Sequence, residues 1–97
     1  MKNNIETKFV EMTSTNTKEN FEIHFIRKSD GVNNFFIYEV TIKDLNTDEF
    51  KTEEFYDYEA ALDVYTSFIN WSLKGMHTFE QRKIILESFK QYYTKKC

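Results

Sequence analysis

The apolar residues of this chain change their spacing at Asp57, and this change is what most constrains the fold. Before Asp57 they alternate with polar residues in short runs, as in residues 21–25, which is typical of strands with one buried face. From 58 to 69 they recur every three or four positions, which is typical of an amphipathic helix. The sequence therefore predicts strands followed by helices.

Turn and capping residues divide these patterns into elements. Strands are predicted over 7–13, 19–28, 34–43 and 49–55, and helices over 57–74 and 79–93. Asp57 is the expected N-cap of the first helix and Gly75 its stop, while Thr78 and Gln81 form a capping box for the second. This order predicts an α+β fold, in which a four-stranded antiparallel meander is followed by two C-terminal helices packed on one face. The polar segment 14–20 leaves the pairing of the first strand open.

Composition predicts one domain over residues 1–97. The chain has no proline and only two glycines, and no low-complexity segment offers a linker. The apolar runs are too short for a secretory signal or a membrane span. The single cysteine is Cys97, so no internal disulfide is expected, and we predict a cytoplasmic protein.

Charge is segregated along the chain. Residues 1–43 are balanced, residues 44–63 carry one basic and eight acidic side chains, and residues 74–97 carry six basic and two acidic ones. A cluster this acidic disfavours nucleic acid as a ligand and favours a protein partner with a basic surface. The alternative is a solvated helix start. The predicted partner-binding residues are Asp48, Glu49, Glu53, Glu54, Asp57, Glu59 and Asp63.

We find no residue pattern for catalysis, a metal or a cofactor. The chain lacks a GxSxG nucleophile turn, a glycine-rich phosphate loop and a dinucleotide fingerprint. The chain has two histidines, His24 and His77, and one cysteine, Cys97. No two of these residues are close enough in the sequence to form a short zinc-ligand pair such as CxxC or HxxxH. We therefore expect a non-enzymatic protein.

Seventeen aromatic residues are more than a core of this size can hide. Alternation in the third strand places Phe36 and Tyr38 opposite Phe35 and Ile37. If the helices cover Phe35 and Ile37, then Phe36 and Tyr38 form an aromatic docking face, or the surface through which the chain forms a homodimer. The second alternative makes the protein a structural or accessory component.

In size, element order and its seven acids, the chain resembles small phage-encoded inhibitors of bacterial defence systems, the anti-CRISPR proteins built from a short antiparallel sheet plus helices. This resemblance implies that the acids occupy a basic groove that would otherwise hold nucleic-acid phosphates. Phe, Tyr, Met, Ile, Asn and Lys account for 46 of the 97 residues. AT-rich codons favour these residues, which suggests a low-GC bacterium, or a phage or mobile element living in one.

Overall fold

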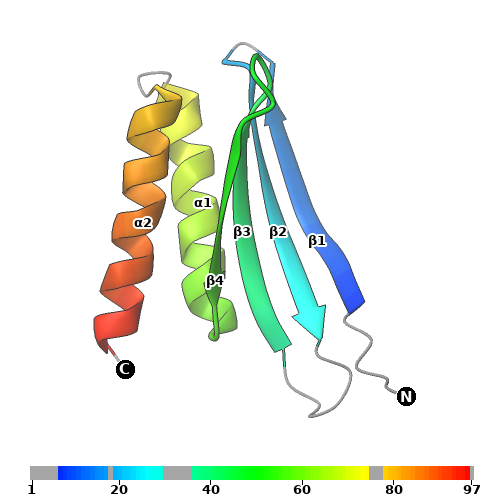
Figure 1. Cartoon of the computed structure of the whole chain (residues 1–97), viewed down its shortest axis with the longest axis vertical. Coiled ribbons are helices and arrows are strands. Elements are labelled where there is room, and N and C mark those ends of the chain that lie inside the picture. Colours follow the sequence, from blue (N-terminus) through cyan, green and yellow to red (C-terminus); the bar gives the residue numbers. More distant parts are fainter. Residues whose placement is uncertain (1–6, 18, 30–35, 75–77, 97) are drawn as a thin grey trace.

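The computed structural model describes residues 7–17, 19–29, 36–74 and 78–96 and has the predicted α+β order (Figure 1). Its elements are β1 (Thr7–Asn16), β2 (Phe21–Ser29), β3 (Phe36–Asp44), β4 (Phe50–Phe55), α1 (Tyr58–Lys74) and α2 (Phe79–Lys96). Predicted features at Phe35, Gly75, His77 and Cys97 lie outside the described residues.

The four strands form one antiparallel sheet in the order β1-β2-β3-β4. The predicted meander is therefore confirmed, and β1 pairs with β2. A register shift between Val10 and Met12 makes Glu11 a bulge in β1. The turn between β3 and β4 contains Asp48 at a φ of 63°, a left-handed conformation that aspartate tolerates better than most residues.

Both helices begin at the predicted caps. Asp57 accepts a hydrogen bond from Ala60 N–H through Oδ2 at 3.1 Å. Thr78 accepts one from Gln81 N–H at 3.2 Å, and Gln81 Oε1 accepts one from Thr78 N–H at 3.0 Å. Each bond satisfies a backbone donor at a helix boundary, and the reciprocal pair is a complete capping box.

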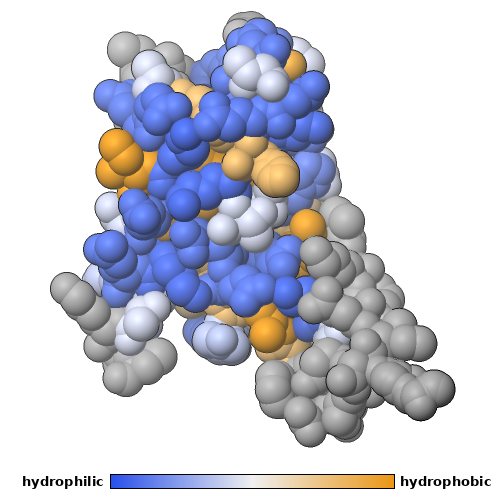
Figure 2. Space-filling view, in the orientation of Figure 1, coloured by the Kyte–Doolittle hydropathy of each residue, from blue (hydrophilic) through white to orange (hydrophobic). Residues whose placement is uncertain are grey.

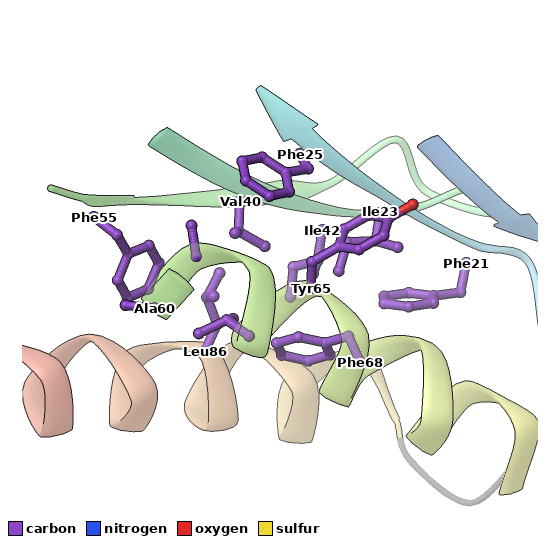
Figure 3. Packing of buried hydrophobic residues seen from close by; sticks show 12 residues of the cluster. Phe21, Ile23, Phe25, Val40, Ile42, Phe55, Ala60, Tyr65, Phe68 and Leu86 are labelled. Atoms are coloured by element: carbon purple, nitrogen blue, oxygen red, sulfur yellow. The ribbon is translucent and has the colours of Figure 1, made fainter. Parts of the chain in front are cut away.

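The helices pack against the same face of the sheet, α1 over β2 and β3 and α2 beside β4 (Figure 1). We call this side the helix face and the opposite side the outer face. Figure 3 shows Val40 pointing from the sheet toward the helices, where Phe68 of α1 and Leu86 of α2 belong to the same buried cluster. The buried cluster comprises Phe21, Ile23, Phe25, Val40, Ile42, Phe55, Ala60, Ala61, Val64, Tyr65, Phe68 and Leu86.

The prediction that Tyr38 lies on the face away from the helices is wrong. Tyr38 belongs to the same alternating set of β3 as the buried Val40 and Ile42, so it lies on the helix face. Its ring centroid lies 6.0 Å from that of Phe25 and 5.5 Å from that of Tyr58. The aromatic residue therefore joins the edge of the core.

The same alternation corrects the placement of Phe36 and Ile37. Phe36 shares the helix face with Tyr38; it is 36% exposed, and the guanidinium carbon of Arg27 lies 4.7 Å from its ring centroid. Ile37 lies on the outer face, because it stands between Phe36 and Tyr38 in β3 and successive side chains of a strand point to opposite faces. The expected aromatic sheet face is therefore not formed by these residues, and the homodimer alternative loses the residues that suggested it.

The outer face is mainly polar. One cross-strand row consists of Thr13, His24, Thr41 and Thr52, which are register neighbours on successive strands. Within this row Thr13 and His24 are joined by a hydrogen bond of 3.1 Å, and Thr41 and Thr52 by one of 2.7 Å. The first bond joins β1 to β2, and the second joins β3 to β4.

Candidate functional site

The seven predicted acids do not form one surface. β4 separates them, because its six residues carry the chain from the β3–β4 turn to the start of α1 at the opposite end of the molecule (Figure 1). Asp48 and Glu49 lie at the turn, Glu53 and Glu54 lie on β4, and the other three lie on or just before α1. Each group has its own surroundings.

The acids at the turn face basic residues of the same chain. The Lys43 ammonium lies 3.7 Å from the Asp48 carboxylate, which is 83% exposed. Glu49 pairs with Lys83 in the first turns of α2. Because Glu49 is used to hold α2 against the turn, this end of the acidic segment offers less negative charge to a partner than the sequence suggests.

The two acids of β4 point to opposite faces of the sheet. Glu53 is the register partner of the buried Val40, so it lies on the helix face, with the Lys51 ammonium 3.4 Å away. Glu54 lies on the outer face and pairs with Lys28. Neither carboxylate is free of an internal cation.

Lys28 holds Glu54 beside a second, buried carboxylate. Its ammonium lies 3.0 Å from Glu39 Oε2, and the side chains of Lys28 and Glu39 are only 12% and 8% exposed. The hydrogen bond from Lys28 holds the pKa of Glu54 below its ordinary value, and the bonds to Glu54 and Glu39 raise the pKa of Lys28. Glu54 is thus part of an ion-pair network in the sheet.

Asp57, Glu59 and Asp63 differ from the other four acids. All three are exposed, and within the described ranges none of them forms an ion pair. Asp57 uses one oxygen to cap α1, and Asp63 accepts a hydrogen bond from the Tyr93 hydroxyl of α2. That bond raises the pKa of Tyr93 to about 12. The uncompensated negative charge of the segment is therefore concentrated on the first two turns of α1.

A groove of about 460 Å³ opens next to these turns, where the end of β4, the start of α1 and the last turns of α2 meet. Most of its lining is apolar, and Tyr56 on its wall is 72% exposed. Its lining residues are Glu54, Phe55, Tyr56, Asp57, Ala60, Lys90, Tyr93 and Thr94. We call it the β4–α1 groove.

Six of the eight lining residues were not predicted as functional, and Lys90 and Tyr93 are two of them. The Lys90 ammonium lies 5.4 Å from the Phe55 ring centroid and 5.6 Å from that of Tyr56, and it donates a hydrogen bond to the Glu54 carbonyl. Tyr93 meets Phe55 edge-on at 6.2 Å. Both come from α2, more than thirty positions away, so no local pattern could place them beside Asp57.

The face of the molecule seen in Figure 2 is dominated by hydrophilic residues. In the view of Figure 2, which has the orientation of Figure 1, they cover most of the molecule, and hydrophobic residues appear as separate patches. A second groove of about 410 Å³ is lined by Ile85, Ser88, Phe89 and Tyr92 of α2, with almost no polar surface. It contains no charged residue that would select a ligand.

A hydroxyl–imidazole–carboxylate chain lies on the outer face. Thr13 Oγ1 is 3.1 Å from His24 Nδ1, and His24 Nε2 is 2.9 Å from Glu22 Oε1. The other carboxylate oxygen of Glu22, Oε2, accepts a hydrogen bond from the Thr15 hydroxyl. The spacing is that of a nucleophile, a base and an orienting acid. None of these residues lines either of the two grooves, whereas active-site residues usually line a concave pocket.

The described residues contain no cluster of three or more His, Cys, Asp or Glu side chains that could hold a metal ion. Among the helices in the described part of the chain, none combines the length and apolarity needed to cross a membrane.

Comparisons with protein-family models, with curated proteins and with solved structures found no match for the chain. The class that the fold defines is thus an α+β protein with an open antiparallel sheet and two helices on one face.

Proposed function

We propose that this protein is a non-enzymatic protein-binding module that docks the acidic start of α1 onto a basic partner. The observation that supports this most directly is the set Asp57, Glu59 and Asp63, whose charges no cation in the described part of the chain neutralises. Exposed charges of one sign on a rigid helix attract an oppositely charged surface and orient it as it approaches.

The partner is a nucleic-acid-binding protein, and the module acts as a small inhibitor made by a phage or mobile element. A basic groove that binds phosphates also accepts a row of carboxylates, since both ligands present negative oxygen atoms to Arg and Lys. The segregated charge supports this proposal, as does the excess of residue types that AT-rich codons favour. Of the seven predicted acids, we keep three as docking residues, because lysines of the chain pair with the other four.

The test compares two triple variants that each remove three negative charges. The first is Asp57→Asn, Glu59→Gln and Asp63→Asn, and the matched control is Asp48→Asn, Glu80→Gln and Glu87→Gln, which are exposed acids elsewhere. Wild-type protein and both variants are immobilised, and bound proteins from a lysate of a low-GC bacterium are quantified by mass spectrometry. We expect a basic protein that the wild type and the control retain and that the first variant loses.

The same columns of immobilised protein allow two further measurements. Added nucleic acid should displace the retained protein, and rising salt should release it, because both compete for the same basic surface. If no protein distinguishes the first variant from its control, the acids at the start of α1 are only a solvated helix terminus, and the proposal is wrong.

A further inference from the structure

The β4–α1 groove, at about 460 Å³, has room for a long side chain. Its walls are the rings of Phe55, Tyr56 and Tyr93 and the methyl group of Ala60. Phe55 and Ala60 are almost fully buried, whereas Tyr56 is 72% exposed. The floor is thus part of the core, and one wall is an aromatic ring that a ligand can reach.

The mouth of the groove beside α1 is negative. Asp57 lines it directly, and Tyr93 on its wall holds the Asp63 carboxylate by a hydrogen bond. Asp57 uses Oδ2 for the helix cap, and its other carboxylate oxygen has no hydrogen-bond partner in the described part of the chain. An apolar groove with a carboxylate at its mouth complements a side chain that is apolar along its length and positive at its end.

Lys90, the lysine that lines the groove, does not neutralise the negative charge at its mouth. Lys90 lies over Phe55 and Tyr56 and donates to the Glu54 carbonyl, so its ammonium is directed to β4. No ion pair joins Lys90 to Asp57 or Asp63 among the described residues. The groove therefore has a basic end at the sheet and an acidic end at α1.

We infer that the β4–α1 groove binds an arginine side chain from a basic segment of the protein partner, with the guanidinium between Asp57 and the ring of Tyr56. This inference rests on the proposed function, because it names the contact through which the acidic surface recognises its partner. Arginine fits better than lysine, since a planar and weakly hydrated guanidinium stacks on an aromatic ring and forms two parallel bonds to a carboxylate.

The experiment uses two fluorescein-labelled heptapeptides, one alternating arginine with glycine and the other lysine with glycine, so that both carry the same charge. Binding to the full chain is followed by fluorescence anisotropy at low ionic strength. We expect the arginine peptide to bind at least about fivefold more tightly than the lysine peptide. Equal binding of the two peptides would overturn the inference.

Three single variants locate the contact. Asp57→Asn should weaken arginine-peptide binding about tenfold, because it removes a charge-assisted bond while asparagine still caps the helix. Tyr56→Ala should weaken it about fivefold through loss of the stacking wall. Asp48→Asn removes the same charge at the other end of β4 and should change binding by less than about twofold. Circular dichroism confirms that each variant is folded.

The possible failures separate the two proposals. If Asp57→Asn and Asp48→Asn weaken both peptides equally, binding follows net charge, so the groove inference is wrong, and the column experiment decides whether the acids at the start of α1 dock the partner. If the arginine peptide does not bind the wild type at low ionic strength, the groove inference is wrong, and the column experiment above decides the proposed function separately.

Discussion

Replacing Lys28 with methionine should destabilise the fold far more than removing a typical strand lysine. Register places Glu39 and Glu54 directly opposite each other on β3 and β4, and the Lys28 ammonium binds both. Like charges at directly opposite positions of a strand pair repel. Lys28→Met therefore removes the cation and leaves two carboxylates side by side, one of them buried.

The magnitude follows from the distance and the burial. At 3.0 Å, the separation of Lys28 and Glu39, two unit charges attract by about 5 to 6 kcal/mol at an effective dielectric constant near 20. Desolvation of both groups offsets part of this attraction, and removal of one member of a buried pair costs roughly 3 to 5 kcal/mol in general. Because Glu54 is 39% exposed, we expect the lower end, a loss of about 3 kcal/mol in the free energy of unfolding.

Urea denaturation followed by circular dichroism measures this loss. The matched control is Lys43→Met, because Lys43 lies on the same face and its partner Asp48 is 3.7 Å away and 83% exposed. The control should cost less than about 0.5 kcal/mol. Adding Glu39→Leu to Lys28→Met should restore much of the stability, because it removes the buried charge. If Lys28→Met costs no more than Lys43→Met, the ion-pair network does not stabilise the sheet.

The same network predicts the pH dependence of this difference. Lys28 holds the pKa of Glu54 below its ordinary value of 4.5, so the pair stabilises the folded state fully above pH 4.5. This contribution is lost as the pH falls through the lowered pKa, since the carboxylate then takes up a proton. The stability difference between wild type and Lys28→Met should therefore shrink in acid.

Two more substitutions test other parts of the fold. Phe68 is fully buried, with its ring 6.3 Å from Phe21 and 6.2 Å from Phe89, so Phe68→Ala should lower the free energy of unfolding by about 3 to 5 kcal/mol; a loss below about 1 kcal/mol in urea denaturation would contradict this packing. The hydrogen bond with His24 lowers the pKa of Glu22 from its ordinary 4.5, so Glu22→Gln should destabilise the protein at neutral pH and progressively less as the pH falls below 4.5; a difference that stays constant in acid would rule out this role for the carboxylate.

Local patterns predicted the elements because each element of this chain begins and ends with its own signals. Asp57, Thr78 and Gln81 form the expected caps, and the change of spacing at Asp57 marks the change from sheet to helix. The strand order also followed, since each turn is short enough to pair neighbouring strands. What the sequence left open was the pairing of β1, whose bulge at Glu11 interrupts the alternation.

The face of β3 was predicted wrongly for a reason that is visible in its residues. Its first half is apolar on both sides, so alternation in residues 35–38 does not choose a face. In the second half one set continues as Val40 and Ile42, while the other becomes Glu39 and Thr41. Counting inward from the second half places Tyr38 on the helix face, as observed.

The buried side of α1 also differs from the side that the spacing of its apolar residues indicates. The spacing of residues 58–69 places Tyr58 on the inward stripe and Ala60 and Val64 on its flank, although Tyr58 is 47% exposed and both flank residues are buried. α2 packs beside α1 and β4, and this second neighbour buries the flank. Similarly, the acids could be recognised from composition, but their division into paired and unpaired groups depends on cations that lie far away in the sequence, such as Lys28 and Lys83.

The order of the strands bears on how the chain reaches its native state. Every strand pair in the sheet joins elements that are consecutive in the chain, so each pairing closes only a short loop and loses little chain entropy before its contacts form. The sequence has no proline, so the slow isomerisation of prolyl bonds cannot delay any of these steps. A newly made copy can therefore assemble hairpin by hairpin as it leaves the ribosome, and the acidic start of α1 is presented as soon as the helices close over the sheet.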